Sequence, residues 1–271
     1  MRLVLPLLAL VLCTAADWET VGTPAPGPTK VIGFYTGGCI QGAQALPPEG
    51  PGYEVIRLSR NRYWAHPATL EFVGRLAEQV RQQGQSHLYI ADIGLPRGGP
   101  FSFGHASHQI GLDVDIWFER STRPRLAGPQ REQLPQRSLV RPADDGIDDH
   151  IFTAQHASIL RLAAETPNVD RMFVNKWIKQ RICQTATGNR AWLRKLVPWI
   201  GHDSHFHVRL YCPPGQPQCT PQAGYADDDG CGEALDLWFR APPVVAPPAD
   251  APRVPYRPRL PAACQAVLTA P

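Results

Sequence analysis

Histidines dominate the side chains of this sequence that could carry out chemistry. Five of the nine fall in two short clusters, which hold His105, His108 and Asp115 in the first and His202, His205 and His207 in the second. Two imidazoles and one carboxylate form a common catalytic zinc set that leaves a fourth position for water. Neighbouring imidazoles can then move protons during hydrolysis. The two clusters therefore predict a hydrolytic metal site rather than isolated structural histidines.

The second cluster runs into a segment that alternates between polar and apolar side chains. Over residues 205–211 this alternation predicts a strand with His205 and His207 on one face and Phe206 and Val208 on the other. The Cα atoms of the two histidines would then lie about 6–7 Å apart. One ring can hold a metal at that separation while the other touches its water.

The first cluster leads into a second alternating segment. Residues 112–118 predict a strand with Asp113 and Asp115 on one face, opposite apolar neighbours. His108 lies in the loop before this strand, and Gly111 gives the loop freedom to fold back. Sequence spacing thus favours a site where this loop and two strands meet.

The elements that must position these strands are read from hydrophobic periodicity and from proline and glycine. Residues 17–60 look irregular, 120–150 look like an exposed polar loop, and 212–231 look like a loop pinned by disulfides. The last 31 residues contain nine prolines and predict an extended, polyproline-like tail. The periodicity predicts helices over 67–83, 157–164, 175–183 and 190–199, and strands over 87–92 and 169–174.

Composition narrows the class of protein. The chain has 271 residues, of which 43% are hydrophobic, enough for one sizeable core. A net charge of +3 is too small for a strongly electrostatic nucleic-acid binder, so no nucleic-acid partner is expected. The 29 prolines and 23 glycines argue against a helical bundle and favour many loops on a compact scaffold.

The N-terminus predicts export. A basic start precedes an apolar run over residues 3–13, which is shorter than the ~20 residues a spanning helix needs. Small residues at 14–16 suit signal-peptidase cleavage, so we expect a signal peptide over 1–16 and a mature chain from Asp17 without a transmembrane segment. A buried N-terminal helix and lipidation at Cys13 are the alternatives, and the bulky Leu12 disfavours lipidation.

Cysteine counting agrees with export. Without Cys13 the chain keeps six cysteines, an even number that suggests three disulfides in an exported protein. Counting alone leaves 15 pairings open. The absence of Cys-x-x-Cys from the sequence argues against a zinc finger. Cys264, near the chain end, suggests that the tail is tied back.

At these motifs the sequence resembles a known group of enzymes. His108-x6-Asp115 with His205-x-His207 resembles the zinc signature of the LAS-type peptidases, which include D-alanyl-D-alanine carboxypeptidases and lysostaphin-like endopeptidases. The fuller runs over 104–116 and 202–210 resemble the penicillin-insensitive murein endopeptidases of the Gram-negative periplasm. The resemblance covers nearly the whole mature chain and continues in residues 34–39, 171–175 and 192–199.

The resemblance implies specific roles for the site residues. His108, Asp115 and His207 become the zinc ligands, and His205 becomes the base or transition-state stabiliser beside the metal water. His105 and His202 match further histidines that line the site. Some members carry an extra Asp-x-x-His after the first cluster, and nothing between Asp144 and His150 matches it convincingly, so we expect one metal. The implied disulfides are Cys39–Cys264, Cys183–Cys231 and Cys212–Cys219.

We therefore expect an α+β fold with a central, mostly antiparallel sheet flanked by helices. Its peptidase domain would span 17–240, followed by a proline-rich tail over 241–271. The implied activity is cleavage of D-alanyl–meso-diaminopimelyl amide bonds between peptidoglycan stem peptides, in the periplasm. Because no acyl-enzyme forms, β-lactams would not inhibit it. The alternatives are a zinc D,D-carboxypeptidase, a non-catalytic wall-binding protein, and a zinc-storage or metal-sensing protein.

Several other features have plainer interpretations. His66 and His87 are expected to be structural or exposed, and His156 to begin a helix. The acidic run over 227–229 lacks the ligand spacing of an EF-hand and reads as a solvated loop. Arg171 and Arg209 are candidates to meet a substrate carboxylate.

Overall fold

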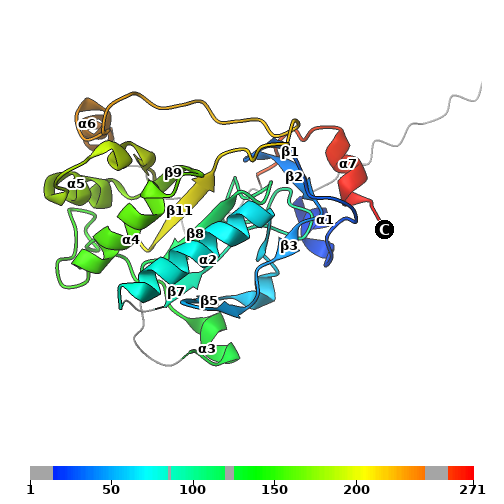
Figure 1. Cartoon of the computed structure of the whole chain (residues 1–271), viewed down its shortest axis with the longest axis horizontal. Coiled ribbons are helices and arrows are strands. Elements are labelled where there is room, and N and C mark those ends of the chain that lie inside the picture. Colours follow the sequence, from blue (N-terminus) through cyan, green and yellow to red (C-terminus); the bar gives the residue numbers. More distant parts are fainter. Residues whose placement is uncertain (1–14, 85–86, 120–124, 242–255) are drawn as a thin grey trace, which may run out of the picture.

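A seven-stranded mixed sheet forms the centre of the computed structural model, which describes residues 15–84, 87–119, 125–241 and 256–271 (Figure 1). Its strands are, across the sheet, β10 (Leu196–Pro198), β9 (Val169–Val174), β11 (His205–Leu210), β8 (Asp113–Trp117), β7 (Leu88–Ile90), β5 (Tyr53–Val55) and β4 (Glu49–Gly50). The β10–β9 and β5–β7 pairs are parallel and the other four are antiparallel. The expected α+β class with a mostly antiparallel sheet is confirmed.

Helices α2 and α4 lie over one face of this sheet (Figure 1). The described helices are α1 (Ala15–Thr20), α2 (Pro67–Gln82), α3 (Gly128–Gln133), α4 (Ala154–Glu165), α5 (Lys176–Thr185), α6 (Glu233–Arg240) and α7 (Ala263–Leu268), with short 3-10 turns η1 (Leu58–Arg60) and η2 (Ala191–Lys195). Helix α2 begins at Pro67, and the ring of His66 accepts a hydrogen bond from the Ala68 N–H as its N-terminal cap. His66 is thus structural, as expected.

The two faces of the sheet differ in character because strand side chains alternate. Val114 and Ile116 of β8, with Phe206 and Val208 of β11, join the main hydrophobic core beneath the helices. Full burial of each such side chain contributes about 1.5–3 kcal/mol. The alternate positions of both strands, which include the predicted histidines, face the opposite side of the sheet.

The expectation of irregular structure over 17–60 is wrong. This stretch forms the hairpin of β1 (Lys30–Phe34) and β2 (Gly37–Gln41), strand β3 (Gln44–Ala45), which pairs with β6 (Trp64–Ala65), and strands β4 and β5 of the main sheet. Its prolines and glycines mark turns between very short strands. Gly33 in β1 has φ +87°, and a Cβ there would lie 2.5 Å from the carbonyl oxygen of Gly37. Glycine is required for that close approach.

Three further expectations need correction. Residues 120–150 include α3 and a buried β-bridge between Val140 and Ile147, so much of this loop packs against the core. Residues 190–199 form the 3-10 turn η2 and strand β10 instead of one helix, because β10 pairs with β9. The tail ends in helix α7, while its residues 242–255 lie outside the described residues.

A second hydrophobic cluster ties the two ends of the described chain together, beside the β1–β2 hairpin (Figure 1). Trp18 and Phe101 pack there with Val267 of α7, and the Cys39–Cys264 disulfide crosses the cluster. Arg97 donates hydrogen bonds to the carbonyl oxygens of Val267, Leu268 and Ala270 at 2.6–3.1 Å. These bonds satisfy groups that the end of a helix leaves unpaired.

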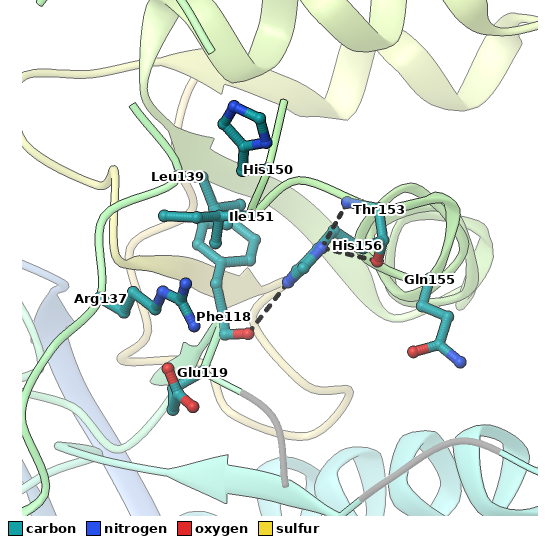
Figure 2. Close-up of a pocket in the computed structure, with 9 residues that line it drawn as sticks. All are labelled: Phe118, Glu119, Arg137, Leu139, His150, Ile151, Thr153, Gln155 and His156. Carbon is teal, nitrogen blue, oxygen red and sulfur yellow. Dashed lines mark hydrogen bonds between the residues drawn. The ribbon is translucent and has the colours of Figure 1, made fainter. Parts of the chain in front are cut away.

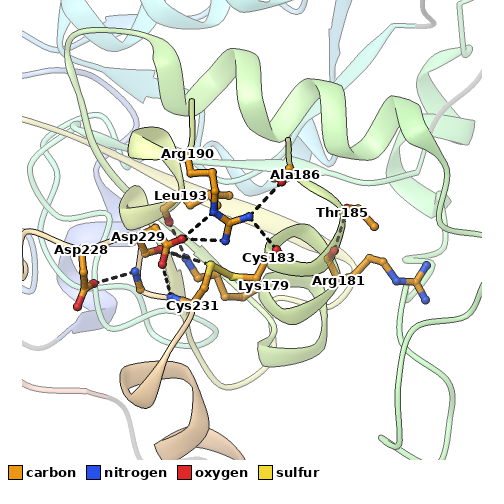
Figure 3. Close-up of a disulfide and its surroundings, with 11 residues drawn as sticks. Lys179, Arg181, Cys183, Thr185, Ala186, Arg190, Leu193, Asp228, Asp229 and Cys231 are labelled. Atoms are coloured by element: carbon orange, nitrogen blue, oxygen red, sulfur yellow. Dashed lines mark hydrogen bonds and ion pairs between the residues drawn. A yellow bond between two sulfur atoms is a disulfide. The ribbon is translucent and has the colours of Figure 1, made fainter. Parts of the chain in front are cut away.

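The other two disulfides pin the segment between β11 and α6. Cys212 bonds Cys219, and Cys231 bonds Cys183 of α5 (Figure 3). All three pairs are those that the family resemblance implies. Each bridge typically adds about 2–4 kcal/mol to stability. Within the described ranges, none of the helices is both long and apolar enough to cross a membrane.

Candidate metal centre

Strands β8 and β11 place two of the predicted residues side by side. Their antiparallel register sets Asp115 opposite His207. Such directly opposed residues have Cβ atoms about 4.5–5.5 Å apart. Because Val114 and Val208 turn into the core, Asp115 and His207 project from the other face. The predicted division of both strands into an apolar and a polar face is confirmed.

His108 reaches the same point from the loop between β7 and β8. Its φ of 69° lies in the left-handed region, and Gly111 has the same φ as the loop turns back. The His108 N–H donates to Asp113 Oδ2 at 3.0 Å, and the ring Nδ1 lies 2.9 Å from the carbonyl oxygen of Ile93. A carbonyl can only accept, so Nδ1 carries the proton and Nε2 is free to face the site.

Three ligand atoms converge at the centre of the cluster. His108 Nε2 lies 3.1 Å from His207 Nδ1 and 3.3 Å from Asp115 Oδ1, and these last two atoms are 3.3 Å apart. Zinc–ligand bonds of about 2.0–2.1 Å in a tetrahedron separate ligand atoms by about 3.3–3.4 Å. The triangle therefore matches one face of a tetrahedral zinc site.

Some polar atoms at the centre of the cluster lack hydrogen-bond partners, which gives a second test of whether the cluster fits a zinc ion. Within the described part of the chain, Asp115 Oδ1 and both ring nitrogens of His205 are buried without a hydrogen bond. Leaving one such atom unpaired costs about 1–3 kcal/mol. Two imidazoles and a carboxylate suit zinc better than magnesium or calcium, which prefer oxygen ligands. The donor set and the orphaned atoms both fit a bound zinc ion.

A second combination of ligands overlaps the first. His105, His108 and Asp115 also offer ligand atoms that all lie within 4.8 Å of one another. His105 Nε2 lies 3.4 Å from Asp115 Oδ2, and His205 Nε2 lies 3.7 Å from that same oxygen. Asp115 thus faces His108 and His207 through one oxygen, and His105 and His205 through the other. His108 and Asp115 belong to both combinations.

The charges in the cluster follow from this packing. Burial by itself raises the pKa of Asp115, but the imidazoles of His108, His105 and His205 lower it well below its usual range. Burial lowers the pKa of His205, and burial together with His205 and His207 lowers the pKa of His202 to about 3. Near neutral pH the site therefore holds an ionised carboxylate beside neutral imidazoles at His202 and His205.

All six predicted site residues meet in this one cluster. The ring of His202 lies 4.9 Å from that of His205 and 6.0 Å from that of His207, and its backbone φ is 54°. The His202 Nδ1 lies 2.9 Å from the carbonyl oxygen of Ile200, which sets its tautomer. The structure brings these residues together; the role of each is a proposal.

Sequence reasoning assigned no role to Asp113, which holds His207 in place. Asp113 Oδ1 lies 2.9 Å from His207 Nε2 and accepts a hydrogen bond of 2.8 Å from Arg209 Nε. Burial raises the pKa of Asp113, but Arg209 and His207 lower it far more. A carboxylate behind a metal-ligating histidine orients its ring. The Asp-Val-Asp spacing, which puts both carboxylates on one strand face, was the available signal.

Asp92, just after β7, was also missed. Its buried carboxylate lies 3.1 Å from Arg60, 3.0 Å from Arg62 and 3.4 Å from His105 Nε2. Arg62 also pairs with Glu19 at 2.8 Å, so four distant segments meet here. Burial raises the pKa of Asp92, but His105 and the two arginines lower it to about 2. An acidic residue ending an apolar strand was the only sequence signal.

A cavity of about 420 Å³ opens beside the cluster. Arg209 lines it, but its guanidinium is held by Asp113 and Gln222, while Arg171 is held by Asp170 and a backbone carbonyl. Both arginines therefore already have partners within the chain. The residues that line this groove are Phe34, Thr36, Gly104, His105, Ala106, Ser107, Phe173, Trp199, Ile200, His202, His207, Arg209 and Gln222.

A smaller cavity of about 180 Å³ lies at the start of α4 (Figure 2). Its one buried polar side chain, His156, lies 3.1 Å from the Phe118 carbonyl oxygen and accepts a hydrogen bond from the Thr153 N–H. His156 is in the first turn of α4, as expected. In the neighbouring acidic run, Asp145 pairs with Arg141 and Asp149 pairs with Arg181.

The fold and the cluster define an α+β protein with a histidine–carboxylate centre of the kind that metal-dependent hydrolases use. A family model described as penicillin-insensitive murein endopeptidase matches residues 31–269. The chain belongs to this family.

Curated relatives agree over nearly their full lengths. A penicillin-insensitive murein endopeptidase from Haemophilus influenzae is 43% identical over 96% of this chain and 91% of its own length. The protein of the same name from Klebsiella pneumoniae is 41% identical over 98% of this chain and 97% of its own length. A third relative of that name, from Salmonella heidelberg, is 40% identical over 94% of this chain and 91% of its own length.

Proposed function

We propose that this protein is a zinc-dependent endopeptidase that hydrolyses D-alanyl–meso-diaminopimelyl amide bonds between peptidoglycan stem peptides. The observation that carries the proposal is the triangle of ligand atoms of His108, Asp115 and His207, whose sides of 3.1–3.3 Å match a tetrahedral zinc face. The names and coverage of the relatives supply the substrate class.

His108 Nε2, Asp115 Oδ1 and His207 Nδ1 would hold the metal. Zinc in such a site polarises a carbonyl group and lowers the pKa of water to about 7. Asp113 fixes the His207 ring from behind, and the Ile93 carbonyl does the same for His108. These partners keep both lone pairs aimed at one point.

His205 is the proposed proton carrier. It is neutral, its ring nitrogens are buried and, within the described residues, neither of them has a hydrogen bond. Nε2 can therefore take a proton from the attacking water and return it to the leaving amine. The ring of His202 packs 4.9 Å from it and limits its rotation.

His105 is suited to hold negative charge. Burial lowers its pKa, but Asp115 and Asp92 raise it above its usual value, which favours the cation. Its Nε2 would donate to the oxyanion of the tetrahedral intermediate. This scheme uses no serine nucleophile, which accounts for insensitivity to β-lactams.

The proposed location is the Gram-negative periplasm. Three disulfides suit an oxidising compartment. The proposed signal peptide, 1–16, falls largely outside the described residues, and burial of Trp18 supports a mature domain that starts just after it. The peptidase domain over 17–240 and the tail over 241–271 remain part of this proposal.

The test uses mature protein from Asp17 onward with purified cross-linked muropeptide dimers and penicillin, with and without a zinc chelator. Mass spectrometry should detect conversion of dimers to monomers that penicillin spares and the chelator abolishes. Release of terminal D-alanine alone would instead identify a carboxypeptidase. Intact dimers in the presence of bound zinc would leave a non-catalytic wall-binding protein.

A further inference from the structure

A row of aromatic rings leads from the metal centre to the edge of the molecule. The ring of Phe173 lies 5.2 Å from that of His207 and 5.5 Å from that of Trp199. Trp199 in turn lies 6.1 Å from Trp238 of helix α6. Ring pairs at these separations are in contact range, so the row is continuous with the proposed active site.

The outer part of this row is open to solvent. The side chains of Trp199 and Ile200 are 51% and 57% exposed, although they are large and apolar, and both line the groove beside the metal centre. Exposed apolar surface at the rim of a groove marks a binding site more often than a defect. The patch is not needed to close the hydrophobic core, which lies on the other face of the sheet.

The backbone that carries Trp199 and Trp238 is also held rigidly. Trp199 directly follows β10, and its N–H donates to the Val174 carbonyl oxygen at 2.8 Å. Helix α6, which carries Trp238, begins two residues after Cys231, whose disulfide anchors it to α5 (Figure 3). Rigid aromatic surfaces bind ligands with little loss of conformational entropy.

Charged and uncharged side chains lie in different parts of the groove. Trp199 and Ile200 carry no charge, whereas the buried Arg209 lies over the Phe173 ring with its guanidinium bound to Asp113 and Gln222. A neutral ligand with flat C–H faces and polar edges suits the indoles, and the N-acetylhexosamine rings of the murein glycan have this chemistry.

We propose that Trp199, supported by Trp238 and Ile200, is a saccharide-binding platform that stacks a sugar ring of the glycan strand whose stem peptide enters the metal centre. This inference rests on the proposed function. An extended four-residue peptide spans at most about 14 Å, a length comparable to the row of rings. The platform would make the enzyme prefer cross-links that are still attached to glycan.

The experiment compares two substrates. Cross-linked peptide dimers are prepared with their glycan intact and after amidase removal of the sugars. We expect Trp199→Ala to lower kcat/KM about threefold to tenfold on the glycan-bearing substrate, the range that corresponds to ~0.5–1.5 kcal/mol of ring stacking. On the sugar-free substrate the change should be less than about twofold on the same scale, and Trp199→Tyr should restore most of the loss.

Tyr256→Ala provides the matched control, because Tyr256 is 43% exposed but does not line the groove. Equal losses on both substrates would overturn the proposal and assign Trp199 to the stem peptide. Unchanged rates on both would overturn it as well. If Trp199→Ala instead abolishes a dimer seen by sedimentation, the patch is an interface with a second copy.

A binding measurement separates this proposal from the proposed function. Peptide-free glycan strands should change the tryptophan fluorescence of the wild-type protein and have little effect on Trp199→Ala. If wild-type protein cleaves neither substrate, the proposed function fails, and the fluorescence titration still decides whether the platform binds saccharide. Absence of any change with wild-type protein would overturn the platform.

Discussion

Two buried polar clusters in this molecule are built in opposite ways. Around Lys179 the polar groups have partners: the buried ammonium donates to the carbonyl oxygens of Leu193 and Asp229 at 2.7 and 2.8 Å (Figure 3). Arg190 pairs with Asp229 beside it. In the histidine cluster, by contrast, Asp115 Oδ1 and both nitrogens of His205 have no partner within the described residues.

Backbone strain separates the two clusters further. His108 and His202 adopt left-handed φ values of 69° and 54°, whereas Lys179 lies in regular helix α5. Strained residues of this kind cost about 1–3 kcal/mol each. A buried group that has hydrogen-bond partners points to a structural role, whereas buried polar atoms without partners, beside strained residues, point to a ligand. This difference marks the histidine cluster as the candidate site without reference to any relative.

The largest expected effect comes from removing a ligand atom of the triangle. His207→Ala should abolish zinc binding and lower kcat by at least about 10³-fold, because the metal-activated water is lost. His105→Ala should keep the metal and lose about 10²-fold in kcat as a proton or charge donor. Metal content by mass spectrometry and dimer cleavage test both variants.

His87→Ala is the control for these variants, because His87 lies outside the cluster. Loss of metal from His105→Ala, with metal retained in His207→Ala, would select the other overlapping ligand set, His105, His108 and Asp115.

A smaller effect should follow when a ligand loses its support. Asp113→Asn removes the carboxylate behind His207, and we expect zinc affinity to fall about 10–100-fold. Competition with a chelator measures this affinity. Asp92→Asn is a matched control, because Asp92 is equally buried and arginine-paired but contacts His105. Equal losses in the two variants would contradict the assignment of His207 as the supported ligand.

A substitution in the Lys179 cluster should change the stability of the protein rather than its activity. Lys179→Met leaves two carbonyl oxygens unpaired, and we expect unfolding free energy at pH 7 to fall by about 1–3 kcal/mol. Urea unfolding measures it. A change in kcat larger than the change in folded fraction would contradict the separation of the two clusters.

The same variant carries a pH signature. Burial lowers the pKa of Lys179 to about 8 from its usual 10.5. The native state then binds fewer protons than the unfolded state between these values, so wild-type stability gains from this group as pH rises through that window. The deficit of Lys179→Met relative to wild type should grow from pH 8 towards pH 10.5.

The smallest effect is expected at the surface. Asp227 is 97% exposed and pairs with Arg194 at 2.7 Å. Exposed pairs contribute about 0–1 kcal/mol. Asp227→Asn should therefore leave both the unfolding midpoint and dimer cleavage almost unchanged. A clear loss of stability would mean that exposure is a poor guide to the energetics of this region.

Sequence periodicity could predict much of the site because strand geometry is local. Alternation alone placed His207 and Asp115 on polar faces of their strands, and it assigned Phe206 and Val114 to the core. It could not show that those two strands pair, which brings His207 opposite Asp115. The ligand set and the disulfide pairs came from the family resemblance, since counting cysteines left every pairing open.

The residues and elements that the sequence did not predict all depend on contacts between segments far apart in the chain. Asp92, Arg62 and Glu19 are far apart in sequence, and no local pattern indicates that they meet beside His105. The short strands β3 and β4 have only two residues each, too few for a periodic signal. Helix α7 escaped notice because it follows a proline-rich stretch and is stabilised by the Cys39 bridge and Arg97.

The bond between Cys39 and Cys264 links positions 225 residues apart. Phe101, in the cluster that this bond crosses, packs against the rings of both His105 and His108. A chain that emerges N-terminus first cannot complete that cluster until its last helix arrives, because such distant contacts form late. The proposed hydrolytic centre should therefore take its final shape only after helix α7 has been synthesised and has docked, which would keep the proposed activity silent until then.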